Sequence, residues 1–475
     1  MPARNGLKAA LAVWLVVVSA AWAEVRLPAI FSDHVVLQRQ QAVPVWGWAD
    51  PGEEITVACA GQTASCKAGA DGRWRVALAP LAEPGPHELV VSGKASTLRL
   101  KDVLVGEVWV CSGQSNMQWT VSASANAQEE AAAANYPKIR MFTVQRRTAE
   151  TPQDDCTGTW AVCDPQTVPQ FSAVGYFFAR HLHRELNVPV GMINSSWGGT
   201  PAESWISRKA LESVPALRPL LERWEKNPDK KTPWRPACLY NGMIAPLVPY
   251  AMRGAIWYQG ESNVGRAYQY RILMPLLIAD WRRAWGQGDF PFGMVQLAPY
   301  RYGPAGEIAC AELREAQTLT MQNTPNVGMA VTMDIGNPKD IHPKNKQEVG
   351  RRLGLWALAK VYGRDLIYSG PIYKSMTVEG NKVRISFDHC GSGLATRDGK
   401  PPSHFAVAGA DQKFYPAQAT LDGNTVVVHS PQVSQPVAVR YAWKDDAEPN
   451  LMNREGLPAS PFRTDQWKGV TEGVD

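Results

Sequence analysis

Between residues 102 and 368, short and nearly continuous apolar runs alternate with stretches that have the apolar spacing of amphipathic helices. Such runs are typical of strands covered on both faces. Strands alternating with helices predict an α/β fold, with a mostly parallel sheet, helices on both faces, and a ligand site at the carboxyl ends of the strands. The expected strands are residues 107–111, 190–194, 254–258, 292–297 and 328–333, and the expected helices are residues 174–186, 267–285, 311–321 and 345–362.

The last expected helix shows the spacing most clearly. Val349, Leu353 and Trp356 recur at helical intervals and are expected to face the sheet. The same spacing turns Arg351 and Arg352 outward.

Two further regions flank the α/β region. Short strand-like runs in residues 24–101 are separated about every ten residues by turn signals such as Asp50-Pro51-Gly52, a rhythm typical of a β-sandwich. Strand-like runs return in residues 371–475. We therefore expect three domains, namely an N-terminal β-sandwich (24–101), an α/β domain (102–370) and a C-terminal β-rich domain (371–475).

Residues 1–23 have the pattern of a signal peptide. Arg4 and Lys8 precede an apolar run over residues 9–19, and Ala21-Trp22-Ala23 fits the small-x-small rule before cleavage. The mature chain is expected to begin at Glu24 and to be exported, to the periplasm or beyond the cell. No later stretch is long and apolar enough to span a membrane.

The charge of the chain points away from nucleic acid. The formal net charge of +5 is distributed along 475 residues and not gathered in Lys/Arg blocks. A small or neutral ligand is therefore expected. Eighteen Trp residues supply faces that can stack on sugar rings, although most are expected to fill cores. The sequence leaves the oligomeric state open.

Export permits disulfides among the eight Cys residues. Cys59 with Cys66, and Cys156 with Cys163, each seven residues apart, are the expected pairs. The other four are expected to be buried thiols or long-range pairs. Their spacing fits no zinc pattern, so neither a metal nor a cofactor is expected.

The most informative segment is residues 106–119, Gly-Glu-Val-Trp-Val-Cys-Ser-Gly-Gln-Ser-Asn-Met-Gln-Trp. An apolar strand runs here into a Gly/Ser turn, which would place the Ser115 hydroxyl at the carboxyl edge of the sheet. A nucleophilic serine needs a base within hydrogen-bonding reach and donors for the oxyanion that it creates.

Three other strand ends carry polar groups to the same edge. Residues 193–200 end in paired glycines, residues 254–263 end in amide side chains, and residues 333–343 end in acidic residues beside His342. Four strand ends are therefore expected to meet at one rim.

These four blocks, in this order, resemble the sialate O-acetylesterase family of the SGNH hydrolase superfamily. The resemblance extends from about Phe31 to Trp467 and includes residues 239–246 and 450–458. It implies an SGNH-type α/β domain at residues 102–370. It also implies that Ser115 is the nucleophile and His342 the general base. The implied oxyanion donors are the N–H groups of Ser115 and of Gly198 or Gly199, with the side chain of Gln259 or, second, Asn263.

The third member of a catalytic triad is less clearly marked. The superfamily usually carries its Asp three residues before the His, where this chain has Lys339. Asp340 is the first choice because the family carries the same Asp-Ile-His-Pro segment. A backbone carbonyl or Asp334 are the alternatives.

Gln118, Trp119, Trp197 and Glu261 are expected to contact substrate because they lie within or beside these blocks. Trp257 is a further candidate for a stacking wall. Glu261 is alternatively expected to steady its loop by pairing with Arg253 or Arg266.

The resemblance predicts a serine esterase that removes acetyl groups from sugars, with O-acetylated sialic acid as the first substrate. Two alternatives remain at this point. The same chemistry could act on acetylated plant glycans such as xylan, or the chain could be a glycan-binding protein without catalysis.

Overall fold

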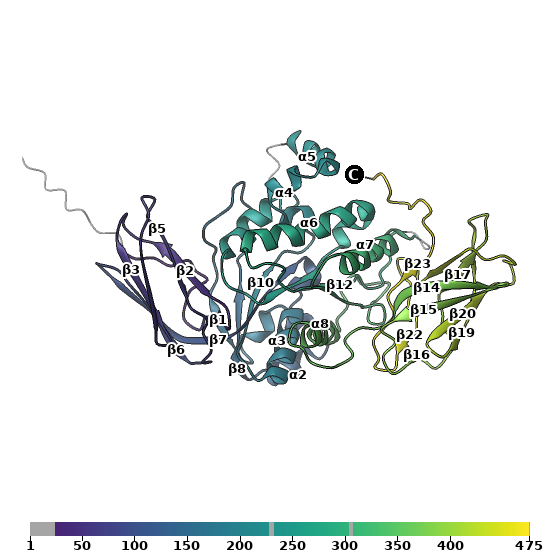
Figure 1. Ribbon diagram of the computed structural model, residues 1–475, viewed down its shortest axis with the longest axis horizontal. Helices are drawn as coiled ribbons and strands as arrows, with labels where there is room; N and C mark the ends of the chain where they lie inside the picture. Colours follow the sequence, from purple (N-terminus) through teal and green to yellow (C-terminus); the bar gives the residue numbers. More distant parts are fainter. Residues whose placement is uncertain (1–23, 228–231, 304–306, 475) are drawn as a thin grey trace, which may run out of the picture.

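A computed structural model describes residues 24–227, 232–303 and 307–474. It shows a β-rich part, a central α/β part and a second β-rich part in a row (Figure 1). The predicted signal peptide, residues 1–23, lies outside the described residues. Within the described part of the chain, no helix combines the length and the apolar character that a membrane span requires.

The central sheet confirms the predicted α/β fold. Its strand order is β13-β12-β11-β7-β10-β8-β9, and all neighbours are parallel except β8 and β9. All five predicted strands are present, whereas β8 and β9 were not predicted. The bounds are β7 (Thr97–Gly113), β8 (Tyr136–Thr143), β9 (Trp160–Cys163), β10 (Val190–Ser196), β11 (Gly254–Tyr258), β12 (Phe292–Val295) and β13 (Val327–Ala330).

All four predicted helices form, and they cover both faces of the sheet. Helices α3 and α8 pack together on one face, and α6 and α7 pack together on the other (Figure 1). Short helices connect the main elements. The bounds are α1 (Ser115–Gln118), α2 (Ala127–Ala132), α3 (Ala173–Leu186), α4 (Arg208–Glu212), α5 (Arg218–Glu225), α6 (Ala267–Trp285), α7 (Ala309–Asn323) and α8 (Lys346–Lys360).

One residue of α8 corrects the sequence analysis. Val349, Leu353 and Trp356 are buried as expected, but Arg352 is only 3% exposed and does not face solvent. Its guanidinium donates to both carboxylate oxygens of Asp334, at 2.7 and 2.6 Å. Helical spacing misplaced Arg352 because the half-buried Asp334 carboxylate, in the loop before α8, pairs with its charge.

Strand β7 joins the N-terminal part to the central sheet. Its first half pairs with β6 and then β1, and its second half lies between β10 and β11. The predicted domain boundary at residue 101 falls inside this strand, and one hydrophobic core extends through both parts. The remaining strands here are β1 (Val36–Gln38), β2 (Val43–Trp48), β3 (Glu54–Cys59), β4 (Gln62–Lys67), β5 (Arg73–Leu78) and β6 (His87–Ser92).

The C-terminal part has a second core, to which Met329, Val331 and Met333 at the end of the central sheet contribute. Its strands pair antiparallel. They are β14 (Ile372–Glu379), β15 (Lys382–Asp388), β16 (Leu394–Thr396), β17 (Phe405–Ala408), β18 (Phe414–Pro416), β19 (Gln418–Asp422), β20 (Thr425–His429), β21 (Ala438–Tyr441), β22 (Leu451–Asn453) and β23 (Phe462–Arg463).

Both predicted disulfides are wrong, because all eight cysteines are free thiols. In the β3–β4 hairpin, Cys59 lies opposite Gln62 and Cys66 lies opposite Ile55, so the two thiols are not cross-strand partners. Cys163 belongs to β9, whereas Cys156 lies in the loop before it. Equal spacing therefore did not indicate proximity.

Candidate active site

Ser115 stands where β7 turns into α1. Gly113, at φ +135°, ends the strand, and a Cβ there would lie 2.1 Å from the carbonyl oxygen of Tyr258 in β11. A glycine is therefore required for the chain to turn so close to its neighbour. Ser115 is the first residue of α1, so its N–H has no acceptor within the helix.

The structure brings Ser115 and His342 together. His342 lies in the loop between β13 and α8, and its Nε2 is 2.9 Å from Ser115 Oγ. The Trp119 ring stacks on the imidazole, with centroids 4.6 Å apart and planes 17° apart. The stacking limits rotation of the imidazole and holds Nε2 toward the hydroxyl.

Asp340 lies beside His342 without bonding to its ring. The Asp340 carboxylate accepts the backbone N–H of His342 at 2.9 Å, and the same oxygen is 3.9 Å from Nδ1. Asp334, the alternative, has both oxygens engaged by Arg352. Of the two predicted carboxylates, Asp340 is therefore the one near the imidazole. It acts on the ring through its charge and through its hydrogen bond with the backbone N–H of His342.

Burial and charge favour the neutral form of His342. Burial lowers the pKa of His342, the Lys346 ammonium lowers it further, and Asp340 opposes both. Only a neutral imidazole can accept the proton of a serine hydroxyl. The site therefore favours the protonation state that a general base needs.

The paired glycines after β10 lie against the serine. A Cβ on Gly198 would be 3.2 Å from Ser115 Cβ. The N–H of Gly198 donates to Gln118 Oε1 at 2.8 Å, so Gln118 holds this turn. Gly199, at φ +74°, faces open space. Of the two predicted glycine donors, Gly199 is thus the one whose N–H donates to no other described residue.

Gln259 and Asn263 form a buried amide pair. Gln259 Nε2 donates to the Thr200 carbonyl at 3.2 Å and to Asn263 Oδ1 at 2.7 Å. Asn263 Nδ2 donates to Glu203 Oε2 at 3.0 Å. Both N–H bonds of Gln259 are engaged within the protein, so in this geometry the two amides tie the glycine turn to the loop after β11.

The remaining predicted contact residues have mixed positions. Trp197 is half-buried, and the guanidinium of Arg146 lies 5.6 Å from its ring centroid. Trp257 is 1% exposed, so it is a core residue and not a stacking wall.

The predicted partners of Glu261 are wrong, because Arg253 pairs with Glu107 and Arg266 pairs with Glu203. Glu261 instead accepts a hydrogen bond from Asn116 at 2.6 Å.

Sequence reasoning missed Lys346 and Asn116. Lys346 is completely buried, and its Nζ donates to Asn116 Oδ1 at 2.5 Å. Asn116 Nδ2 also donates to the Ile341 carbonyl, at 2.9 Å. A lysine at the start of a helix normally lies in solvent, so nothing in the local sequence marked it.

Trp234 was missed as well. Its indole N–H donates to the Gly199 carbonyl at 2.7 Å, yet 48% of the residue is exposed. An exposed ring anchored on the glycine turn presents a flat apolar face beside the site. No sequence motif surrounds Trp234, so only its contact with Gly199 reveals its place.

Comparison with known proteins fits this geometry. Residues 105–360 match the family model described as carbohydrate esterase, sialic acid-specific acetylesterase. The chain is 32% identical to the sialate O-acetylesterase of Mus musculus, across 88% of this chain and 89% of that protein. The chain belongs to the sialate O-acetylesterase family. The human sialate O-acetylesterase is also 32% identical, across 94% and 95% of the two chains.

A solved structure of a carbohydrate acetylesterase is similar over most of the chain. The crystal structure of a carbohydrate acetylesterase from Xanthomonas citri is 42% identical and has a TM-score of 0.87, covering 94% of this chain and 100% of that chain. The protein is therefore a carboxylic-ester hydrolase, as the sequence predicted. The likeness includes the C-terminal and N-terminal parts as well as the α/β part.

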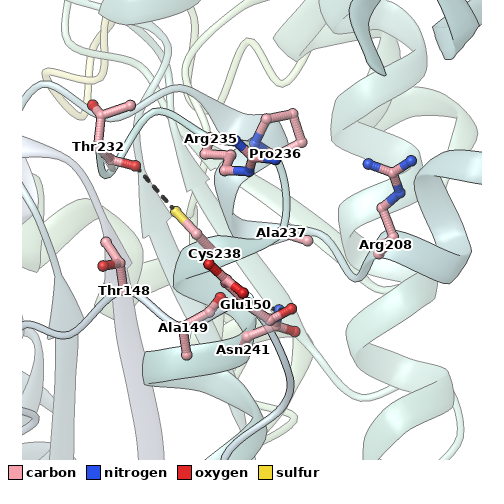
Figure 2. A pocket seen from close by; sticks show the side chains of 10 residues that line it. All are labelled: Thr148, Ala149, Glu150, Arg208, Thr232, Arg235, Pro236, Ala237, Cys238 and Asn241. Carbon is pink, nitrogen blue, oxygen red and sulfur yellow. Dashed lines mark hydrogen bonds between the residues drawn. The ribbon is translucent and has the colours of Figure 1, made fainter. Parts of the chain in front are cut away.

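A cavity of about 570 Å³ is lined in part by the loop around Trp234, through Thr232 and Arg235. Figure 2 shows the side chains that line it. The Cys238 thiol, one of the lining groups, points to the Thr232 carbonyl, 3.6 Å away. Neither Ser115 nor His342 lines this cavity. Its size is that of a small-ligand site, separate from the Ser115–His342 pair. The described residues contain no cluster of His, Cys, Asp and Glu suited to a metal ion.

Proposed function

We propose that the protein hydrolyses acetyl esters of sugars, with Ser115 as nucleophile and His342 as general base. The observation that carries the proposal is the 2.9 Å hydrogen bond between Ser115 Oγ and His342 Nε2, contributed by segments 227 residues apart. Chance rarely brings a serine at a helix N-terminus to a histidine of lowered pKa at a sheet edge. Family membership supports the same reaction.

The reaction proceeds in two steps. His342 Nε2 removes the Ser115 proton while Oγ attacks the acetyl carbonyl, and the N–H groups of Ser115 and Gly199 stabilise the oxyanion. The C–O bond to the sugar then breaks, and His342 gives its proton to the departing sugar oxygen. Water, deprotonated by His342, attacks the acetyl-Ser115 ester, and acetate leaves as Ser115 regains its proton.

The acetylated sugar is the substrate class, and we propose O-acetylated sialic acid as its first member. The family model and the mammalian relatives carry that specificity in their names. Acetylated plant glycans such as acetylxylan are the second candidate, because the Xanthomonas citri relative is described by the broader term carbohydrate acetylesterase. Acetate release from the two substrate classes, at equal ester concentration, decides between them.

The Ser115→Ala variant tests the catalytic proposal. It should lose at least about 10³-fold in kcat for a generic acetyl ester, because no nucleophile remains. Ser112→Ala is the matched control, since Ser112 lies three residues earlier and its buried hydroxyl has no hydrogen-bonding partner among the residues that the structure describes. Full activity in Ser115→Ala, with an unchanged unfolding profile, would falsify the proposal.

We further propose that the enzyme is exported by means of residues 1–23. The basic start, the apolar run and the Ala21-Trp22-Ala23 site support this. N-terminal sequencing of the secreted or periplasmic protein should give Glu24 as the first residue. A full-length chain recovered from the cytoplasm of the native host would contradict export.

A further inference from the structure

Three polar side chains from three separate segments form a buried chain behind Ser115 and His342. Lys346 belongs to α8, Asn116 follows the nucleophile in α1, and Glu261 begins η7 (Glu261–Arg266). Lys346 Nζ donates to Asn116 Oδ1, at 2.5 Å, and Asn116 Nδ2 donates to Glu261 Oε1, at 2.6 Å. The Asn116 amide therefore links a buried cation to a buried carboxylate.

The same amide reaches the loop of His342. Asn116 Nδ2 is 2.9 Å from the carbonyl oxygen of Ile341, the residue before His342. Asn116 is thus adjacent in sequence to Ser115 and bonded to the neighbour of His342. A shift of this amide would change the separation of the two reacting side chains.

Stability alone accounts poorly for Lys346. Its side chain is completely buried, and its hydrogen bond goes to a neutral amide. Burying an ammonium group in this way is costly, and apolar replacements of buried charged groups are often neutral or stabilising. Burial lowers the pKa of Lys346 to about 7, and burial also raises the pKa of Glu261. A costly group held beside a reaction centre points to a role in the reaction.

We propose that Lys346 is a positioning residue for ester cleavage, which acts through the Asn116 side chain to hold the His342 loop at hydrogen-bonding distance from Ser115. This inference rests on the proposed roles of Ser115 and His342. The charged and titratable groups near the Lys346 ammonium are Glu261 from η7 and Asp340 and His342 from the preceding loop. The rings of Tyr258 and Trp119 also face it, with centroids 5.2 and 6.0 Å away.

Lys346→Met, which keeps an unbranched side chain only one atom shorter and removes the charge, is the direct test. It should lower kcat about 10- to 100-fold, because sub-ångström alignment of the base is lost, and leave KM within about two-fold. The acidic limb of kcat/KM should move to higher pH, because the cation that lowers the pKa of His342 is gone. Lys344→Met removes an equal charge at an exposed position of the same loop, so it should change neither kcat nor the position of the acidic limb.

Asn116→Ala breaks the same chain from the other side and serves even if Lys346→Met folds poorly. If Lys346 acts through Asn116, the two losses should not add. The kcat of the double variant Lys346→Met/Asn116→Ala should then be no more than about three-fold below that of the less active single variant. Fully additive losses overturn the inference, as does a Lys346→Met enzyme with unchanged kcat and an unmoved acidic limb. Activity retained in Ser115→Ala would instead overturn the proposed function, so the two failures are distinguishable.

Discussion

At the residue scale, the His342 imidazole is controlled from three sides. Trp119 stacks on one face, Lys346 lowers its pKa and Asp340 raises it. Asp340 has no hydrogen bond to Nδ1, so its influence on the ring is through charge and through the backbone N–H that it accepts. The balance of these effects is measurable as a pH profile.

The lowered pKa of His342 predicts where activity fails in acid. Because the proposed general base acts as the neutral imidazole, kcat/KM should fall as pH drops through the pKa of His342, with half-maximal activity below pH 6.5. Asp340→Asn keeps the acceptor for the backbone N–H but removes the charge, so its acidic limb should lie at still lower pH. A profile of kcat/KM from pH 4 to 8 checks both enzymes. A midpoint of the acidic limb above pH 6.5 in the unaltered enzyme would contradict the prediction.

Trp234 predicts a separate effect on sugar binding. Trp234→Ala should raise KM for an acetylated sugar about 3- to 10-fold, which corresponds to the binding free energy of one aromatic contact. KM for a small non-sugar acetyl ester should not change. Trp234→Phe keeps a ring but loses the hydrogen bond to Gly199, and so separates stacking from support of the turn. Equal losses on both esters would show that Trp234 only holds the turn.

At the scale of elements, α8 carries two buried charged side chains that the helix spacing did not indicate. Lys346 at its first turn reaches the site, and Arg352 two turns later holds the end of the sheet by binding Asp334 and the Val331 carbonyl. Both side chains are buried. The helix therefore fixes the loop between β13 and α8, which contains His342, at both of its ends.

Removing the Arg352 charge should destabilise the fold. Arg352→Met leaves the Asp334 carboxylate without its partner, which costs on the order of 3 kcal/mol in the free energy of unfolding. Arg351→Met, next to it and more exposed, breaks a pair with Glu348 and should cost less than about 1 kcal/mol. Denaturant unfolding of the two variants measures the difference, and equal costs would refute a structural role specific to Arg352.

At the scale of the whole molecule, the N-terminal part and the central sheet form one unit. Strand β7 passes through both, and Glu107 in its middle is completely buried. Arg39, just after β1, and Arg253, just before β11, both bind its carboxylate. Burial raises the pKa of Glu107, but its hydrogen bonds and charge contacts with Arg253 and Arg39 outweigh burial and lower it.

This clamp predicts a pH-dependent stability. A lowered carboxyl pKa contributes stability above the unfolded value, near 4.5, and that contribution is lost as pH falls through the folded pKa. Glu107→Gln should therefore be less stable than the unaltered protein at pH 7, by on the order of 3 kcal/mol, and the difference should narrow below pH 4.5. Unfolding midpoints at pH 7 and pH 4 test this. Glu88→Gln, at an exposed pair, should show no such narrowing.

The sequence by itself determined the kind of sheet, four of its covering helices and the segments that end at its active edge. Apolar runs and helical spacing are local patterns, so β11 and α6 were predicted with their observed bounds. The Gly113-Gln114-Ser115 turn and His342 were recognisable for the same reason, since each lies where a local strand pattern stops. Strand β8 was not, because Pro137, Lys138 and Arg140 interrupt its apolar pattern.

Only the tertiary structure decided which polar groups are partners. The amides of Gln259 and Asn263, the thiols of Cys59 and Cys66, and the charges of Arg352 and Lys346 have partners or neighbours that spacing along the chain does not reveal. Asn116 and Lys346 are 230 residues apart, and Arg352 is buried although its spacing places it outside. Periodicity reports which face of an element is apolar. Burial of a charge depends on whether a distant segment supplies a hydrogen-bonding partner, and only the folded chain brings that segment near.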